Sequence, residues 1–551
     1  MELKKLTDTF AVSPQIRIAD LPALREVGIR SLICNRPDGE GADQPTFTEI
    51  EQAARQAGIE AHYLPVETGK VSDQDAEQFR RYLDTLPRPM LAYCRSGMRS
   101  ATLWALASAP QLSLVEILAA GKRAGVDLSG LARRIGSPRA SSEEQHDVVI
   151  VGAGAAGVAT ASSLLARAPG LDIAIIDPAD VHYYQPGWTM VGAGVFRPET
   201  TARPMGSVLP GKVCWIKAAV AAFEPATNAV ILEGCRIVKY RQLVVCPGLK
   251  LDWNAIEGLP QTLGRNGVTS NYRYDLAPYT WQLVQQFKGG RALFTQPPMP
   301  IKCAGAPQKA MYLSSDHWRR SGRLDQIDVE FFNAGAALFG VADYVPALMK
   351  YVESYGIKLN FGFNLTAVDG EAKRATFSRA LAGGGSERFE TAFDMLHVVP
   401  PQKAPDFIRV SPLADAAGWV DVDQASLRHK AYENIFGLGD ATNTPNAKTA
   451  AAARKQAPVV AHNVLAALGE KRGVAAYDGY GSCPLTVERG KIVLAEFLYG
   501  GKVAPTFPAW LIDGKKPSGL AWLLKERILP PLYWRGMLKG REWFVQPHVA
   551  D

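Results

Sequence analysis

The chain has 551 residues, 47% of them apolar and 21% charged, which is the composition of an ordinary globular protein. Its length is too great for one hydrophobic core and predicts three to four units of about 150 residues each. The net charge of +7 is modest for this size and gives no reason to expect nucleic-acid binding. Neither a signal peptide nor an apolar run long enough to span a bilayer is found, so we expect cytosolic or matrix-like catalytic domains.

The first predicted domain covers residues 1–135 and alternates short strands with helices. Strands are expected at 30–34, 60–64 and 90–93, with helices at 48–56 and 72–83 between them. The last strand runs into Cys94, and another helix follows the cysteine loop. Loop amides and a helix N-terminus that converge on a sulfur favour its thiolate form, so Cys94 is a candidate nucleophile.

The loop Cys94-Arg-Ser-Gly-Met-Arg99 combines features of two enzyme classes. Its Cys-x4-Arg spacing resembles that of rhodanese sulfurtransferases, whereas cysteine-dependent phosphatases carry His-Cys-x5-Arg, and here Tyr93 precedes the cysteine. The surrounding pattern, with residues 28–37 and Asp73 or Asp75 ahead of a helix, resembles dual-specificity phosphatase-like domains. Three interpretations stay open: sulfur transfer by Cys94 and Arg99, phosphatase activity, and a binding module without catalysis.

A polar, serine-rich segment at 133–146 predicts a linker, placed at 136–146, directly before a glycine-rich fingerprint. Strand 148–151 leads into Gly-x-Gly-x-x-Gly, then a helix, a second strand at 172–176 and an acid, which together predict a dinucleotide-binding fold. The alternative is a glycine-rich turn in another kind of α/β unit. The first glycine allows the tight turn, the second lets a pyrophosphate approach the backbone, the third lets the helix pack on the strand, and the acid accepts ribose hydroxyls. The predicted contacts are Gly152, Gly154, Ala156, Gly157 and Asp177.

Five further segments carry a family resemblance. They are HYYQPGWTMVGAG at 182–194, PIKCAGAPQKAMYLSS at 300–315, SPLADAAGWVDVD at 411–423, FGLGDATNTPNAKTAAA at 436–452 and YDGYGSCPL at 477–485. In this order they make residues 147 to 545 resemble the sulfide:quinone oxidoreductases of the flavin disulfide reductase superfamily, particularly the mitochondrial type. The resemblance implies oxidation of hydrogen sulfide to sulfane sulfur with FAD, transfer of electrons to quinone, and a small thiol or sulfite as sulfur acceptor.

The expected fold class is therefore α/β: a small phosphatase/rhodanese-like domain fused to a two-Rossmann flavoprotein. The FAD domain is placed at 147–265 and 385–475, a degenerate second Rossmann-like domain at 266–384, and a C-terminal quinone and membrane-interface region at 476–551. Further predicted cofactor contacts lie on strand ends and in the resembled segments: Gln185, Gly248, Gly439, Asp440 and Lys448. A helix at 442–449 is expected to face the flavin. No cysteine occurs at 178–213, so FAD is expected to be noncovalent.

The expected second nucleotide fold has lost its own fingerprint. Its strand at 327–332 runs into Asn333-Ala-Gly335-Ala-Ala-Leu-Phe-Gly340, which leaves one glycine in the turn where a pyrophosphate would approach. Nicotinamide binding is therefore disfavoured. A generic flavin-dependent NADH:quinone reductase and a redox sensor without turnover remain the alternative functions.

The seven cysteines contain no CxxC pair, so neither a disulfide framework nor a metal site is expected. Those at 34, 214, 235 and 246 lie on or beside apolar strands and are predicted to be packing residues. Cys303 is the predicted redox thiol, because Lys302 and Lys309 supply positive charge beside it, and the resemblance implies covalent chemistry between this thiol and flavin.

One position departs from the resembled family, whose second redox cysteine would follow Gly439-Asp440, where this chain has Ala441. A disulfide between positions 303 and 441 is therefore impossible. Three alternatives stay open: direct attack of sulfide or a thiol on a Cys303 persulfide, resolution by Cys483, and transfer of sulfur to Cys94.

The last 50 residues interleave tryptophan and leucine with lysine and arginine, Lys525 among them. This pattern suits an amphipathic hairpin at a membrane interface, with its cations toward anionic lipid and a quinone entering near Tyr480. We therefore expect a peripheral protein on the cytoplasmic face of a membrane. A packing helix or a contact in a homo-oligomer is the alternative.

Overall fold

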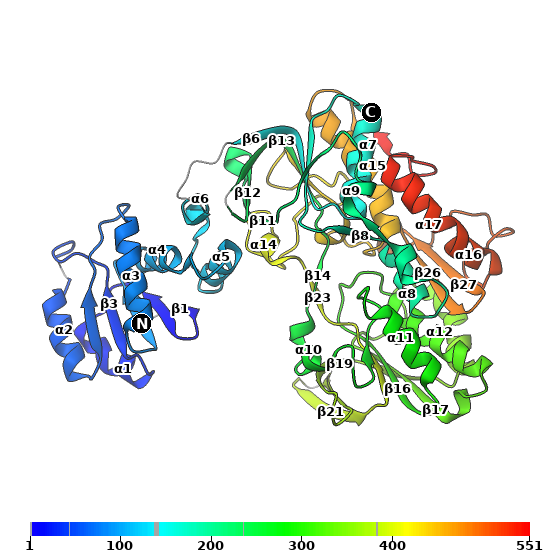
Figure 1. Ribbon diagram of the computed structural model, residues 1–551, viewed down its shortest axis with the longest axis horizontal. Coiled ribbons are helices and arrows are strands. Elements are labelled where there is room, and N and C mark those ends of the chain that lie inside the picture. The colour runs from blue at the N-terminus through cyan, green and yellow to red at the C-terminus, as the bar shows by residue number, and fades with distance from the viewer. Residues whose placement is uncertain (1–2, 43, 137–142, 235, 382–383, 551) are drawn as a thin grey trace. The chain divides into compact units, whose positions relative to one another are not determined.

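The computed structural model describes residues 3–42, 44–136, 143–234, 236–381 and 384–550 (Figure 1). The chain divides into two compact units. The first comprises Met1–Gln145, Ala218–Lys239 and Asp406–Pro412, and the second comprises His146–Lys217, Tyr240–Pro405 and Leu413–Asp551. Two short stretches from the middle of the chain thus group with the N-terminal residues.

The first unit is built on a five-stranded sheet in the order β1-β2-β5-β3-β4, parallel except for the β1–β2 hairpin. The strands are β1 (Lys4–Thr7), β2 (Phe10–Ser13), β3 (Ser31–Cys34), β4 (Glu60–Tyr63) and β5 (Met90–Tyr93). Sequence patterns predicted the last three within a residue. They did not predict the hairpin, whose two strands have only four residues each.

The helices of the first unit begin where the sequence supplies caps. Thr46 and Ser72 each accept a hydrogen bond from the backbone N–H three residues on, in capping boxes completed by Glu49 and Asp75. The helices are α1 (Leu21–Glu26), α2 (Phe47–Gln56), α3 (Asp73–Thr85), α4 (Met98–Ser108), α5 (Leu114–Arg123), α6 (Ala132–Gly136) and α14 (Asp406–Arg409), with strands β11 (Val220–Glu224) and β12 (Ala229–Leu232). The described residues at the two ends of the predicted linker belong to secondary structure, to α6 on one side and to β6 on the other. Residues 137–142 lie outside the described part of the chain.

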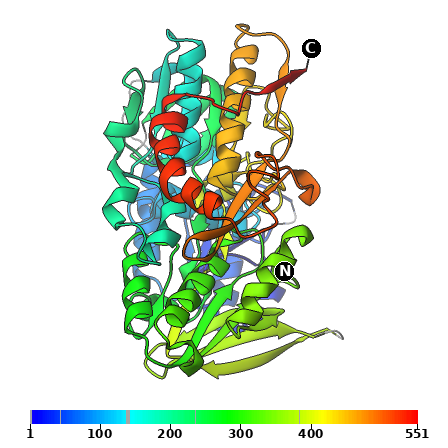
Figure 2. The ribbon, with the colours of Figure 1, turned by 90° about the vertical axis from the view of Figure 1, so that its right-hand side faces the viewer.

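The second unit contains the expected dinucleotide fold. Parallel strands run in the order β10-β7-β6-β13-β24, and α7 connects β6 to β7. The elements are β6 (Glu144–Val151), α7 (Ala155–Arg167), β7 (Ile173–Ile176), β10 (Cys214–Ile216), β13 (Ile237–Val245), β24 (Ile435–Gly437) and α15 (Ala450–Ala467). Helices α7 and α15 lie side by side (Figure 2), because their small buried residues allow close approach.

A second parallel sheet, in the order β15-β22-β16-β17-β18, forms the expected second Rossmann-like layer. Its elements are β15 (Val268–Thr269), α11 (Ala277–Gln286), β16 (Gly290–Gln296), α12 (Ala306–Arg320), β17 (Ile327–Asn333), α13 (Val345–Ser354), β18 (Lys358–Phe361) and β22 (Met395–His397). An antiparallel sheet of β19 (Phe363–Asp369), β20 (Arg374–Ala380) and β21 (Ser386–Ala392) adjoins it. Short elements complete this unit: β8 (Val181–Tyr183), α8 (Trp188–Val191), β9 (Ala202–Pro204), α9 (Met205–Val208), β14 (Lys250–Leu251), α10 (Leu259–Thr262) and β23 (Gln402–Lys403).

The C-terminal region consists of a strand hairpin and one irregular helical run. The strands are β25 (Val474–Ala476), β26 (Gly481–Glu488), β27 (Lys491–Phe497) and β28 (His548–Ala550), and the run comprises α16 (Gly519–Leu523), η11 (Leu524–Ile528), α17 (Leu529–Pro531), η12 (Leu532–Gly536) and η13 (Met537–Lys539). The predicted amphipathic hairpin was wrong for these helical residues, since the segments follow one another in a single run, which lies beside α7 (Figure 2). Among the described residues, no helix is both long and apolar enough to cross a bilayer.

Candidate functional site

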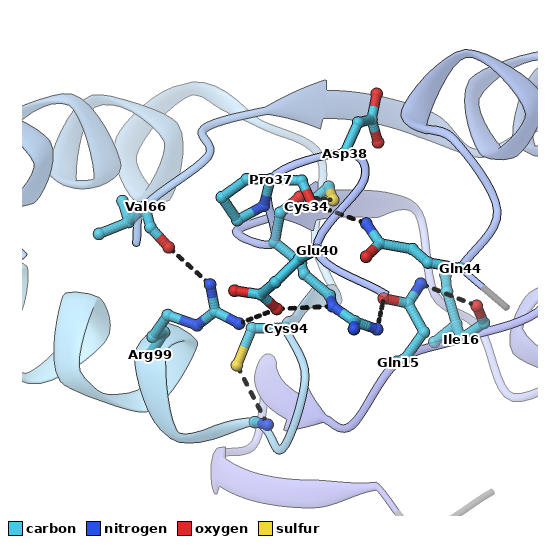
Figure 3. A network of polar contacts seen from close by, with 12 residues as sticks. Gln15, Ile16, Cys34, Pro37, Asp38, Glu40, Gln44, Val66, Cys94 and Arg99 are labelled. Atoms are coloured by element: carbon cyan, nitrogen blue, oxygen red, sulfur yellow. Dashed lines mark hydrogen bonds and ion pairs between the residues drawn. The ribbon is translucent and has the colours of Figure 1, made fainter. Parts of the chain in front are cut away.

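In the first unit, the loop that follows Cys94 folds back, so that one of its backbone N–H groups reaches the cysteine sulfur (Figure 3). Cys94 lies at the end of β5, and its Sγ accepts a hydrogen bond of 3.2 Å from the N–H of Gly97. Gly97 has a φ of 88°, which glycine adopts without the strain of a side chain, and helix α4 starts at the next residue. The sequence therefore predicted the strand, loop and helix arrangement around Cys94 correctly.

The arginine of this loop is held by a carboxylate. Arg99 donates to the carbonyl of Val66 at 2.7 Å and to Glu40 Oε2 at 2.8 Å, and Arg36 donates to the same oxygen at 2.8 Å (Figure 3). Hydrogen bonds from Arg99, and less so from Arg36, hold the pKa of Glu40 below its usual range. A carboxylate bonded to the arginine of this loop would repel the two negative charges of a phosphate ester. Sequence analysis missed Glu40, because it lies in a loop without a recognisable pattern.

The glycine turn after β6 has the shape of a nucleotide cradle. A Cβ at Gly157 would lie 1.8 Å from the carbonyl oxygen of Gly152, so helix and strand approach as closely as the fingerprint predicts. Gly154, by contrast, has no atom within 4 Å of a Cβ position, so this side of the turn is open to a ligand. Asp177 accepts a hydrogen bond of 2.7 Å from the N–H of Ala153 and sits at the mouth of the same turn. Ala156 is buried in α7.

A second group of predicted cofactor residues surrounds Asp440. Burial raises the pKa of Asp440, and the charges of Lys448 and Lys302 oppose that rise. Burial lowers the pKa of both Lys448 and Lys302 to about 8. Lys302 donates to Gln185 Oε1 at 2.7 Å, which brings a third predicted residue into the group.

One expectation about this group was wrong. Residues 442–449 do not form a helix: α15 begins only at Ala450, after Thr449 caps it. Lys448 instead turns back and donates to the carbonyl of Thr442 at 2.7 Å, so this stretch is a loop held by its own lysine.

These residues fit a flavin dinucleotide. Trp188 Nε1 and Thr189 Oγ1 are buried and have no hydrogen-bond partner among the described residues, although a buried donor without a partner is costly. Gly248 has a φ of 77° and no atom within 4 Å of a Cβ position. Open glycines and unpaired buried donors in one unit are what a bound cofactor with polar edges requires.

The loop that carries Cys303 is fixed directly beside the Asp440 group. The N–H of Cys303 donates to the carbonyl of Lys448 at 2.7 Å, and Ala306, the first residue of α12, donates to the carbonyl of Cys303 at 2.7 Å. The phenol of Tyr272 also donates to this carbonyl, at 3.3 Å. Cys303 has a φ of 47°, a conformation uncommon for a residue with a side chain, so these contacts hold the thiol in one place.

Two groups contact the thiol of Cys303. Its Sγ lies 3.7 Å from Cys483 Sγ and accepts a hydrogen bond of 3.1 Å from Lys309 Nζ. The hydrogen bond from Cys483 lowers the pKa of Cys303 well below its ordinary value and outweighs burial, and the charge of Lys309 lowers it further. The predicted thiolate character thus has a structural cause, although of the two predicted lysines only Lys309 contacts the sulfur.

Lys525 is a site residue that sequence analysis misplaced. The chain pattern put it among cations that face lipid, but only 3% of its surface is exposed, and its charge acts on both Cys303 and Cys483. Burial, and then repulsion from Lys309, lowers the pKa of Lys525 to about 7. Glu526 and Arg527 directly follow Lys525, so no signal in the sequence distinguished this lysine from its charged neighbours.

The remaining cysteines divide as follows. Cys34 and Cys246 are buried, as predicted for packing residues, and burial raises the pKa of both thiols. Cys214 is exposed, so the packing prediction was wrong there, because β10 lies at the edge of its sheet. Cys235 lies outside the described residues. Ala441 is fully buried.

In the turn after β17, where the second glycine fingerprint has been lost, an asparagine side chain occupies a backbone donor. Asn333 Oδ1 accepts a hydrogen bond of 2.8 Å from the N–H of Gly335, a donor that a pyrophosphate would need. The helical residues that follow, a 3-10 turn at Ala342–Tyr344 and then α13, begin after Gly340 and not within the turn.

Comparison with known proteins agrees with both parts of the chain. Residues 2–111 match the family described as beta-lactamase hydrolase-like protein, phosphatase-like domain. The mitochondrial sulfide:quinone oxidoreductase of Dictyostelium discoideum is 41% identical over 403 residues, which cover 72% of this chain and 86% of that protein. The enzyme of the same name from Mus musculus is 38% identical over 400 residues, 73% of this chain and 88% of that protein.

A solved structure shares the fold. The sulfide:quinone oxidoreductase from Aquifex aeolicus superposes with a TM-score of 0.60 at 18% identity and covers 74% of this chain and 97% of its own. The glycine cradle, the Cys303 loop and the close relatives lead to one conclusion: the chain belongs to the sulfide:quinone oxidoreductase family and carries an additional phosphatase-like domain at its N-terminus.

Proposed function

We propose that this protein oxidises hydrogen sulfide to sulfane sulfur and passes the two electrons to a quinone, with Cys303 as the thiol that handles the sulfur. The observation that carries the proposal is the Cys303 thiolate, which lies 3.1 Å from a buried ammonium group. A thiolate is the reactive form of cysteine, and one stabilised at neutral pH suits sulfur exchange.

The cofactor that we assign is noncovalent FAD, which would supply two-electron chemistry when bound. The glycine turn at 152–157 and Asp177 would hold its dinucleotide part, with Gly248 nearby. Asp440 and Lys448 would contact the flavin end, since their loop is joined by a backbone hydrogen bond to that of Cys303. Gln185 would join them there, because it accepts a hydrogen bond from Lys302. In this arrangement the chain orients the thiol and keeps it ionised.

A nicotinamide-dependent reductase is not favoured. The N–H of Gly335, which a pyrophosphate would need, is already bonded to Asn333, and the helical residues that follow begin only at Ala342. Electrons should therefore enter from sulfide and not from NADH.

The test is anaerobic addition of sulfide to the flavin-loaded protein, followed by a short-chain quinone. We expect sulfide to bleach the long-wavelength flavin band and quinone to restore it. The Cys303→Ser variant should not bleach, whereas Cys214→Ser, which removes an exposed thiol, should behave as wild type. Bleaching by NADH and not by sulfide would overturn the proposal.

We also propose that Cys94 accepts sulfane sulfur rather than hydrolysing phosphate esters. Support comes from its short Cys-x4-Arg loop and from Glu40, whose carboxylate bonds Arg99 and would repel a phosphate dianion. The Cys94→Ser variant should keep full bleaching by sulfide and change only the sulfur product, identified by mass spectrometry. Hydrolysis of p-nitrophenyl phosphate that depends on Cys94 would contradict this assignment.

The C-terminal region is proposed to lie on a membrane surface, where a quinone is available. Several of its large apolar side chains are exposed, among them Trp510 at 84% and Phe544 at 89%, with Leu520, Leu523 and Ile528. Aromatic and aliphatic groups of this kind insert at the lipid interface. The protein should float with anionic liposomes in a density gradient, and replacement of Leu520, Leu523 and Ile528 by serine should reduce flotation.

A further inference from the structure

Side chains that can bind a metal ion gather at one edge of the sheet that carries the glycine turn. Strands β6, β7 and β10 run parallel in this sheet, and the glycine turn follows β6 at its carboxyl end. His146 lies near the amino end of β6, and Cys214 is the first residue of β10. Because the amino ends of parallel strands share one edge of a sheet, both residues lie at the edge opposite the nucleotide turn.

Three ligand atoms of different kinds come together at this edge. One atom from each of Glu144, His146 and Cys214 lies within 4.8 Å of the other two. Glu144 and His146 are two positions apart on β6, and alternate residues of a strand point to the same face. Zinc binds sulfur, nitrogen and oxygen ligands at about 2.0 to 2.3 Å, so the ligands of one ion are about 3 to 4 Å apart. Small side-chain rotations would therefore let the three groups share one ion.

The imidazole of His146 is held by a further side chain. Asp172, the residue before β7, has its two carboxylate oxygens 3.0 and 3.1 Å from His146 Nδ1. A histidine that binds a metal usually donates its other ring N–H to a carboxylate, which fixes the ring and makes it a better ligand. Only 8% of the surface of His146 is exposed, so packing also fixes this ring.

The ion pair that Glu144 already forms is compatible with metal binding. Its carboxylate pairs with the guanidinium of Arg236. A carboxylate has two oxygens, so one can bind an ion while the other stays on the arginine. Cys214 is exposed, which gives an ion in solution a route to the site.

We propose that Glu144, His146 and Cys214 bind a single divalent transition-metal ion, Zn²⁺ foremost, with Asp172 orienting the histidine. One sulfur, one nitrogen and one oxygen ligand suit Zn²⁺, whereas Mg²⁺ and Ca²⁺ prefer oxygen ligands throughout. Water would complete the coordination. On binding, the Cys214 thiol gives its proton to solvent, and the resulting thiolate contacts the ion.

This metal site is independent of the proposed sulfide chemistry. It would tie the start of β6 to the start of β10, two strands that β7 separates in the sheet. It lies at the edge of the sheet away from the glycine turn, so metal binding should require neither FAD nor sulfide. Failure of the metal site and failure of the proposed function would therefore appear in separate experiments.

The first experiment uses wild-type protein and no variant. The full chain is freed of metal with EDTA, dialysed and treated with iodoacetamide in the presence or absence of Zn²⁺, and alkylation of each cysteine peptide is followed by mass spectrometry. We expect Zn²⁺ to slow alkylation of Cys214 at least roughly 10-fold, since a metal-bound thiolate is a poorer nucleophile. Added EDTA should restore the rate, and Mg²⁺ should not change it. Equal alkylation rates of Cys214 with and without Zn²⁺ overturn the inference.

The second experiment measures zinc affinity by competition with a chromophoric chelator. Cys214→Ser and His146→Asn should each weaken zinc binding at this site roughly 100-fold or more, and Asp172→Asn roughly 10-fold or more. Cys34→Ala, which removes a buried thiol of the first unit, is the matched control and should bind zinc as wild type does. Cys214→Ser changes an exposed position, so the metal-free variant should keep the wild-type melting temperature. Wild-type zinc affinity in a folded Cys214→Ser variant would show that other groups hold the ion, and the inference would fail.

Discussion

Removal of the charge on Lys309 tests how the protein keeps Cys303 ionised. The Lys309→Met variant keeps a side chain of similar length in a buried position but loses the ammonium group, whose Nζ lies 3.1 Å from the thiol sulfur. At that distance the attraction between unit charges is about 5 kcal/mol for an effective dielectric constant of about 20. We therefore expect the pKa of Cys303 to rise in the variant, because its thiolate loses this attraction.

The sign of the pH effect follows from the direction of this change. In the wild type the lowered pKa keeps Cys303 as a thiolate well below the ordinary thiol range, whereas the variant protonates as the pH falls below that range. The other charged groups near this sulfur, Lys525, Lys302 and Asp440, are unchanged in the variant. The difference between the two proteins should therefore be small at high pH and large at low pH.

The assay is the rate of iodoacetamide alkylation at Cys303, measured by peptide mass spectrometry across a pH series. At about pH 6 we expect the variant to react roughly 100-fold more slowly than wild type, since only the thiolate is alkylated. Lys288→Met, at an exposed lysine, is the matched control. Identical pH profiles for wild type and Lys309→Met would refute the view that this ammonium group holds the thiolate.

Three further predictions follow from other contacts. Burial lowers the pKa of Lys525 to about 7, so its charge is present below that pH and lost above it. The pH profile of Cys303 alkylation should therefore show a step near neutral pH, and Lys525→Met should remove that step. Persistence of the step in the variant would contradict this prediction. Gly154→Val adds a side chain where no atom lies within 4 Å, so the purified variant should carry at least roughly 10-fold less FAD by absorbance at an unchanged melting temperature; full FAD content would show that this turn does not hold the cofactor. Glu40→Gln removes the negative partner of the buried Arg99. In urea unfolding of the full chain, the free energy of unfolding of the first unit should fall by about 2 kcal/mol. An unchanged urea midpoint for this unit would mean that the ion pair does not stabilise it.

Several features of this protein could be predicted because neighbouring residues decide them. The strand, loop and helix around Cys94 and the turn at Gly152 are each set by fewer than about 30 contiguous residues, whose hydrophobic spacing and glycines determine their local geometry. The thiolate character of Cys303 was predicted for the same reason, because Lys309 lies one helical turn into α12.

Other predictions failed where local pattern and tertiary packing differ. The loop before Ala450 was expected to be helical, but the backbone there pairs with the Cys303 loop instead, and the hydrogen bond between the N–H of Cys303 and the carbonyl of Lys448 leaves no room for a helical turn. Lys525 was assigned to a lipid-facing surface from composition alone. The packing of its helical run put it inside.

The sequence by itself determined the class of the protein, through a glycine turn for a dinucleotide and a thiol beside lysines. Only the tertiary structure decided which groups contact the Cys303 thiol and which charges lie beside it. The physical reason is distance along the chain: Cys303, Cys483 and Lys525 lie on separate elements, so their approach depends on how α12, β26 and the C-terminal helical run pack, and no local pattern encodes that packing.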